Sequence, residues 1–194
     1  PKSIKLAKTG SAAITGTNSC KKLAALLSTA ADSTKDALAQ DKKEVETFLN
    51  NVANSVVKDG SAYSAIKMAV PADYFKQTED EFSAYTKTLD PSDEAYGMTF
   101  EQFIDALLSA QIKSITNSVQ SIKISVADLS DCKSKLTADQ KQMYASCGDI
   151  AKAYIAKIKS DVTFKPGADT SGYNTDDLGK ITVVNAGGNW YIAG

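Results

Sequence analysis

The sequence of 194 residues contains no histidine and no arginine, so all 22 basic side chains are lysines. Without imidazole the chain has no histidine general base, no histidine metal ligand and no side chain that titrates near neutral pH at its ordinary pKa. Without guanidinium it lacks the bidentate donor that clamps phosphate, carboxylate and guanine. These absences remove much of the usual catalytic chemistry, and we expect the protein not to be an enzyme.

Long apolar runs and an excess of one charge are also missing. The 22 lysines and 23 acids leave a net charge of -1 and are interspersed along the sequence. The sequence therefore has no cluster of positive charge of the kind that binds nucleic acid. The longest apolar stretches are about as short as Leu23–Leu27, far below the roughly 20 residues that cross a bilayer. With 43% apolar residues the chain can still bury a core, so we expect a globular protein without a transmembrane segment or a nucleic-acid partner.

Cysteine is scarce, with three residues in the chain. A disulfide between Cys132 and Cys147 would close a loop of about 15 residues and contribute about 3 kcal/mol on the chain-entropy model. Two small buried apolar side chains fit these positions equally well, and Cys20 is left over. The chain begins at Pro1 and shows none of the three regions of a signal peptide. We therefore predict a processed product that is extracellular or on the cell surface.

Residues 1–18 are predicted to form an extended arm, and residues 19–194 a single domain. The arm is small and polar, and its large apolar side chains are Ile4, Leu6 and Ile14. A terminal segment of this kind frays unless it is tied down. We therefore name these three side chains as candidate interface residues that hold the arm on its own domain or on a neighbouring copy.

Helical periodicity then runs from Asn18 to about residue 117. The first part ends at Gly60 and carries apolar residues at helical spacing. Asp41 is predicted to begin a strong helix, because Glu44 follows three residues later as in a capping box. The pattern is compatible with one long helix or with two helices that meet at a bend over residues 32–36.

Two further helices follow. Proline suits the first turn of a helix, so Pro71 marks the start of one helix, and Pro91 marks its end. Thr99 is predicted to be the N-cap of the next helix, with Gln102 at the third helical position. Its apolar stripe is the clearest amphipathic pattern in the chain and extends to Ile115.

After Asn117 the apolar period falls to two, which predicts β-strands. A short helix with the capping pair Thr137 and Gln140 is expected between the first two strands, and Gly187 and Gly188 supply the positive φ of a tight final hairpin. The predicted strands span residues 120–129, 154–164, 181–184 and 190–192. Helices first and antiparallel strands last indicate an α+β domain.

Five segments of the second half carry a resemblance to a known superfamily. They are Ser121–Val126, Thr137–Tyr144, Ala153–Ala156, Ile181–Val184 and Asn189–Ile192. In these segments the chain resembles the sheet of the nuclear transport factor 2-like (cystatin-like) superfamily, in the form found in exported proteins of Gram-positive bacteria. The resemblance implies a curved antiparallel sheet that wraps around a long helix as a cone, whose mouth often holds a small ligand or a partner. Enzymes of that superfamily commonly use Asp, Tyr, His or Arg in the cone, and this chain lacks the last two.

Two candidate sites remain. The oxygen-bearing side chains of Asp169, Asn174, Asp176 and Asp177 cluster in the loop between two strands. Such loops bind calcium weakly in extracellular modules, although solvated turn residues give the same pattern. The second candidate is a pocket lined by Tyr154 and Trp190, for which aromatic packing within the sheet is the simpler explanation.

Three functions fit this sequence. The first is a non-catalytic exported or cell-surface structural protein that self-associates through its N-terminal arm, for example by adding a strand to an exposed sheet edge. The second is a module that binds a small ligand or a cell-wall component in the cone. The third and least favoured is an enzyme that relies on Asp, Glu, Tyr or Lys alone, which would require a tyrosine and an aspartate, or two carboxylates, to converge in a buried cleft.

Overall fold

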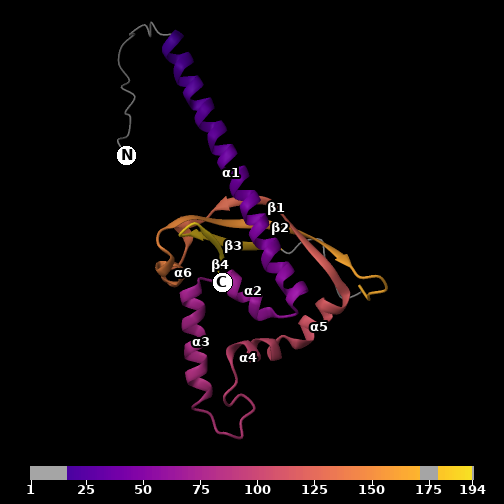
Figure 1. Ribbon diagram of the computed structural model, residues 1–194. Coiled ribbons are helices and arrows are strands. Elements are labelled where there is room, and N and C mark those ends of the chain that lie inside the picture. Colours follow the sequence, from indigo (N-terminus) through magenta and orange to yellow (C-terminus); the bar gives the residue numbers. More distant parts are fainter. Residues whose placement is uncertain (1–16, 171–178, 194) are drawn as a thin grey trace. The chain divides into compact units, whose positions relative to one another are not determined.

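The computed structural model describes residues 17–170 and 179–193 (Figure 1). By its internal contacts the chain divides into two units, residues 1–39 and residues 40–194. Helix α1 (Thr17–Asp59) forms all of the described part of the first unit, and its residues 40–59 belong to the second unit. The helix runs without interruption through residues 32–36, so the bend considered there is not present. Ile4, Leu6 and Ile14 of the predicted arm lie outside the described residues.

The second unit confirms the α+β prediction, because helices precede an antiparallel sheet. Between α1 and the sheet lie four helices: α2 (Ala62–Ala69), α3 (Ala72–Thr86), α4 (Phe100–Leu107) and α5 (Ser109–Ser118). The sheet consists of β1 (Val119–Asp131), β2 (Ile150–Phe164), β3 (Gly179–Ala186) and β4 (Asn189–Ala193). Between β1 and β2 lie α6 (Ala138–Met143) and the 3-10 turns η1 (Lys133–Lys135) and η2 (Ala145–Cys147).

Local signals set several helix boundaries as predicted. Gly60 ends α1 with a φ of 64°, a conformation that suits glycine. Thr99 forms a full capping box with Gln102 at the start of α4, and Thr137 does the same with Gln140 at the start of α6. Two other predictions, the extent of the helix that begins at Thr99 and the start of a helix at Asp41, were wrong. The single helix predicted to begin at Thr99 and to extend to Ile115 is in fact two helices, α4 and α5, which meet at Leu108 with a φ of -104° and a ψ of 10°.

The predicted helix start at Asp41 is also wrong, because Asp41 lies inside α1. Its carboxylate and that of Glu44 accept hydrogen bonds from distant side chains instead of forming a capping box with the local backbone. Tertiary partners therefore outweigh the local pattern at these two positions.

The four strands pair antiparallel in chain order, β1-β2-β3-β4. Ala186 is the register partner of Asn189, so a two-residue turn closes the last hairpin. Both residues of this turn are glycines, Gly187 and Gly188, with φ values of 58° and 85°. The predicted hairpin is thus confirmed, since positive φ at both positions is the requirement of a type I′ turn.

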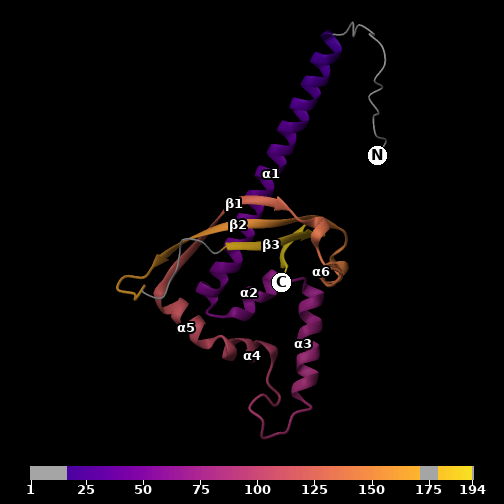
Figure 2. The ribbon, with the colours of Figure 1, turned by 180° about the vertical axis from the view of Figure 1, so that it is seen from behind.

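Residues 40–59 of α1 pack on the inner face of the sheet, which curls around them (Figures 1 and 2). Val45 and Leu49 are buried there with relative exposures of 0% and 3%. Their partners are the inward side chains of three strands, Ile124, Val126, Leu129, Ala156, Ile158 and Val183, together with Trp190. The main core therefore lies between one helix and the sheet.

Side chains of α1 also cover the free edge of β1. Asn50 accepts a hydrogen bond from the backbone N–H of Ile124 at 2.7 Å and donates one to its carbonyl at 2.8 Å. Asn54 repeats the pattern with Ile122, at 3.0 and 2.7 Å. Each carboxamide donates its second hydrogen to the α1 carbonyl four residues earlier. A helix thus supplies the hydrogen bonds that a neighbouring strand would make.

The same ladder extends by one more position, where Glu46 accepts a hydrogen bond from the Val126 N–H at 2.7 Å. We call Glu46, Asn50 and Asn54 the α1 ladder. Four residues of helix rise about 6 Å, and two residues of strand rise about 6.6 Å. The nearly equal repeats explain why every fourth helix residue meets every second strand residue. An open strand edge is a template for pairing with another chain, and here that edge is closed.

A second cluster lies on the outer face of the sheet. It includes Cys132, Tyr144 and Val184, which are 3%, 0% and 0% exposed. Cys132 and Cys147 both belong to this cluster, Cys147 at its partly buried margin, and both are free thiols. The structure therefore has them as small packing side chains, the alternative to a disulfide.

The described residues contain no helix that is both long enough and apolar enough to cross a bilayer.

Candidate functional site

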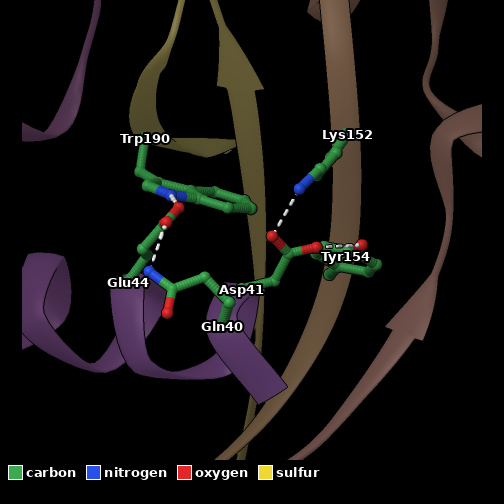
Figure 3. A network of polar contacts seen from close by, with 6 residues as sticks. All are labelled: Gln40, Asp41, Glu44, Lys152, Tyr154 and Trp190. Atoms are coloured by element: carbon green, nitrogen blue, oxygen red, sulfur yellow. Dashed lines mark hydrogen bonds and ion pairs between the residues drawn. The ribbon is translucent and has the colours of Figure 1, made fainter. Parts of the chain in front are cut away.

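A network of polar contacts joins α1 to the sheet at the start of the second unit (Figure 3). The carboxylate of Asp41 is almost fully buried, with the whole residue 3% exposed. Its Oδ1 accepts a charge-assisted hydrogen bond from Nζ of Lys152, and its Oδ2 accepts one from the Tyr154 hydroxyl at 2.7 Å. Lys152 and Tyr154 both lie on β2. This buried carboxylate is therefore satisfied by a cation and a hydroxyl from one strand.

One turn further along α1, Glu44 forms the second half of the network. Its Oε2 accepts a hydrogen bond from the indole Nε1 of Trp190 at 3.2 Å, and its Oε1 accepts one from Gln40 at 2.8 Å. Hydrogen bonds from Gln40 and Trp190 lower the pKa of Glu44, which therefore remains charged at neutral pH. Glu44 fixes the indole of Trp190 in place.

Trp190 forms part of a groove between α1, α2 and the hairpin of β3 and β4. The groove has a volume of about 640 Å³. Its apolar lining comes from Phe48, Met68, Val70, Trp190 and Tyr191, and its polar lining includes Lys43, Glu44, Thr47, Asn51, Lys67 and Asn189. We call this feature the Trp190 groove. Its size and its mixture of apolar walls with a few polar groups are typical of small-molecule sites.

The structure brings the two predicted pocket residues together. The rings of Tyr154 and Trp190 stack, with centroids 6.0 Å apart and planes inclined by 28°. Trp190 lines the groove, whereas Tyr154, Asp41 and Lys152 are not among its lining residues. Tyr154 thus stacks on Trp190 without being part of the groove lining.

Asp41, Lys152 and Tyr154, which we call the Asp41 cluster, hold α1 on β2. Both carboxylate oxygens are engaged within the chain, by Lys152 and by Tyr154. Burial and the hydrogen bond to Asp41 raise the pKa of Tyr154 well above its usual range. Its hydroxyl is therefore a hydrogen-bond donor at neutral pH and is poorly suited to act as a base or nucleophile. A tyrosine and an aspartate do converge, as an enzyme would require, but they do so outside the groove.

The predicted calcium loop is described only at its start. Asp169 follows β2 and is exposed, whereas Asn174, Asp176 and Asp177 lie outside the described residues. Among residues 17–170 and 179–193, no three acidic, cysteine or histidine side chains gather as metal ligands would.

Several residues of the network were not recognised from the sequence as a site. Asp41 and Glu44 matched a local capping pattern, while the strand residues that donate to them, Lys152, Tyr154 and Trp190, lie more than 100 residues away in the chain. The α1 ladder left a clearer signal. Glu46, Asn50 and Asn54 recur every four residues beside the apolar stripe, and asparagine is a poor helix former. Such spacing indicates a polar contact of the helix with another element.

Comparison with protein-family models, with curated proteins and with solved structures finds no match to this chain. The resemblance to the nuclear transport factor 2-like superfamily therefore stays a prediction that depends on the segments quoted above.

Proposed function

We propose that residues 40–194 form a non-catalytic binding module, and that the Trp190 groove takes a small amphiphile with an anionic head. The observation that carries this proposal is the groove itself, an apolar hollow of about 640 Å³ beside an indole held by Glu44. The apolar part of the ligand would contact Phe48, Met68 and Trp190, and such burial is the main source of affinity for apolar ligands.

The charges around the groove favour an anionic head. Lys43 and Lys67 both line it. Among the described residues Glu44 is the one acid that lines it, and both oxygens of that carboxylate already accept hydrogen bonds, from Gln40 and Trp190. The groove therefore has two lysine ammonium groups and one carboxylate, which is already hydrogen-bonded within the chain. This excess of positive charge favours a ligand with a carboxylate, sulfonate or phosphate head over one with a cationic head.

The proposal places this protein among binding modules and not among enzymes, because the Asp41 cluster is saturated within the chain. The extracellular or cell-surface location remains part of the proposal on the evidence of the sequence. Self-association through the N-terminal arm remains a separate prediction, since the arm lies outside the described residues.

Trp190 is the single tryptophan of the chain, so its fluorescence reports directly on the groove. We expect a saturable change in that fluorescence when dodecanoate is added below its micellar concentration. Dodecyltrimethylammonium, which has the same tail and a cationic head, should bind more weakly. Equal binding of both probes would contradict the anionic preference, and no saturable signal with either would overturn the proposed site.

A matched pair of variants tests the location. Met68 lines the groove and is 41% exposed, whereas Leu107 is 62% exposed on α4 and does not line it. Met68→Gln should weaken dodecanoate binding about tenfold, the equivalent of about 1.4 kcal/mol. Leu107→Gln removes a similar apolar side chain from the surface and should leave binding unchanged. The same loss in both variants would place the ligand elsewhere.

A further inference from the structure

One helical segment of the second unit holds an excess of acids, although acids and lysines are interspersed along the sequence as a whole. Residues 72–107 contain nine acids and two lysines, a net charge of -7. The outer face of the sheet, in contrast, carries four lysines and two aspartates. Folding therefore converts a nearly neutral chain into a unit with two oppositely charged surfaces.

The negative surface covers the end of α3 and the connection to α4. We call it the acidic tyrosine surface and define it by the exposed residues Glu81, Tyr85, Asp90, Asp93, Glu94 and Tyr96; the same stretch holds one exposed lysine, Lys87. The two tyrosines are 60% and 47% exposed, and both are among the large apolar side chains that the unit leaves in water. The ion pair of α3 joins Lys76 to Asp80 and uses none of these carboxylates.

The connection between α3 and α4 is fixed by its own hydrogen bonds. Asp90 accepts a hydrogen bond from the Ser92 N–H at 2.9 Å, and Asp93 accepts one from the Ala95 N–H at 2.8 Å. The hydroxyl of Thr86, at the end of α3, reaches the carbonyl of Met98 at 3.3 Å. These hydrogen bonds order the backbone of the connection that carries Asp90, Asp93 and Tyr96.

The positive surface follows from the strand register. Ile124 and Ile158 point to the inner core, so their immediate neighbours Lys123, Lys157 and Lys159 point to the outer face. Lys180 of β3 is the register partner of Lys157 and shares that face. We call Lys123, Lys157, Lys159 and Lys180 the lysine face. All four are exposed, and the described residues provide no ion pair to any of them.

Two aspartates moderate this face without neutralising it. Asp161 is the register partner of Lys123, and Asp128 is that of Lys157. Lys157 and Lys180 nevertheless stand directly opposite each other, and like charges in that position destabilise a sheet. An acidic partner placed over these two lysines would relieve the repulsion.

We propose that this protein associates head to tail, with the acidic tyrosine surface of one copy on the lysine face of the next. The charges are complementary, and exposed tyrosine rings attract lysine ammonium groups through cation-π contacts. The connection from α3 to α4 lies at the end of the unit away from the sheet in both views (Figures 1 and 2). The two surfaces therefore belong to different sides of one copy and pair between copies.

Because the two surfaces differ, the contact is heterologous. Repeating it generates either an open chain of copies or a closed ring. The association is independent of the Trp190 groove and of the N-terminal arm. Since exposed charges carry it, it should weaken steeply as salt rises and the Debye length shortens.

Sedimentation of the full chain over a range of concentrations tests the proposal. We expect association at 20 mM NaCl that is lost at 500 mM NaCl. Lys157→Gln/Lys159→Gln should weaken it about tenfold or more, and Glu81→Gln/Glu94→Gln should have a similar effect. Lys58→Gln/Lys113→Gln removes two exposed lysines outside the lysine face and serves as the matched control, which should associate like the parent chain.

Mixing the two defective variants provides the decisive measurement. The first variant keeps its acidic tyrosine surface and the second keeps its lysine face, so the mixture can form one contact and no more. We expect a one-to-one dimer from the mixture, with no larger species. A monomer at low salt in the parent chain, equal association in all variants, or a mixture that fails to pair would each overturn the head-to-tail contact.

Discussion

Replacement of Asn50 by alanine should reveal how much the α1 ladder stabilises the second unit. The carboxamide of Asn50 exchanges two hydrogen bonds with the backbone of Ile124, at 2.7 and 2.8 Å. A hydrogen bond of this kind contributes about 1 kcal/mol net, so two contribute about 2 kcal/mol. Alanine is the better helix former by about 0.6 kcal/mol. We therefore expect Asn50→Ala to lower the free energy of unfolding by about 1.5 kcal/mol.

The adjacent Asn51 provides the control for this substitution. It lies on the same helix, is exposed, and among the described residues its side chain makes no hydrogen bond to β1. Asn51→Ala gains the same helix propensity without losing a ladder contact, so it should be neutral or stabilising by about 0.6 kcal/mol. Urea unfolding followed by circular dichroism measures both variants. If Asn50→Ala and Asn51→Ala agree within about 0.5 kcal/mol, a difference typical of neutral surface changes, the ladder does not stabilise the fold as argued here.

Hydrogen exchange locates the same effect on the strand. The amide of Ile124 is protected by Asn50, and that of Ile122 is protected by Asn54. In Asn50→Ala the exchange of the Ile124 amide should accelerate far more than that of Ile122. Uniform acceleration along β1 would indicate a general loss of stability, and unchanged exchange at Ile124 would show that the Asn50 carboxamide is not what protects this amide.

Two further predictions concern the outer-face cluster and the last hairpin. Burial raises the pKa of Tyr144 from 10.0 to about 12, so the unfolded state loses this proton first. The contribution of the Tyr144 hydroxyl to the free energy of unfolding is therefore full below pH 10 and declines as the pH rises toward 12. Tyr144→Phe loses the hydrogen bond to Ile192, which should cost about 1 kcal/mol at neutral pH, and it should flatten the alkaline decline of the urea midpoint. A methyl group on Gly187 would overlap the carbonyl oxygen of Cys147, whereas one on Gly188 meets nothing within 4 Å. Both alanine variants are strained at positive φ, so thermal unfolding should show a clearly lower midpoint for Gly187→Ala, and equal midpoints would contradict the steric argument.

The parts of the fold that the sequence predicts are those with local causes. Capping by Thr99 and Thr137, termination at Gly60 and the hairpin at Gly187 depend on residues within a few positions of each other. Strand β1 was predicted from its alternation, since one face of it packs on α1. The break at Leu108 was missed because the apolar stripe continues across it, and a hydrophobic pattern does not register a local change of backbone angle.

The candidate site was harder to predict because its contacts are tertiary. Asp41 is separated by 113 residues from Tyr154, and Glu44 is separated by 146 residues from Trp190. Nothing local distinguishes these acids from a capping pair. Of the two residues predicted to line a pocket, Trp190 lines the groove, whereas Tyr154 is not among the lining residues and stacks on the Trp190 ring.

Residues 40–59 of α1 connect the edge of the sheet to the groove, because one face of this helix binds the edge of β1 and another face lines the groove. Glu46, Asn50 and Asn54 bind the edge of β1, whereas Lys43, Glu44, Thr47, Phe48 and Asn51 line the Trp190 groove. The ladder fixes the rotation and the register of the helix against the sheet, since a shift by one residue would lose every carboxamide contact. The same constraint holds Phe48 and Glu44 opposite Trp190. The shape of the groove therefore depends on hydrogen bonds made at the far edge of the sheet, and a helix held by apolar packing alone would position it less strictly.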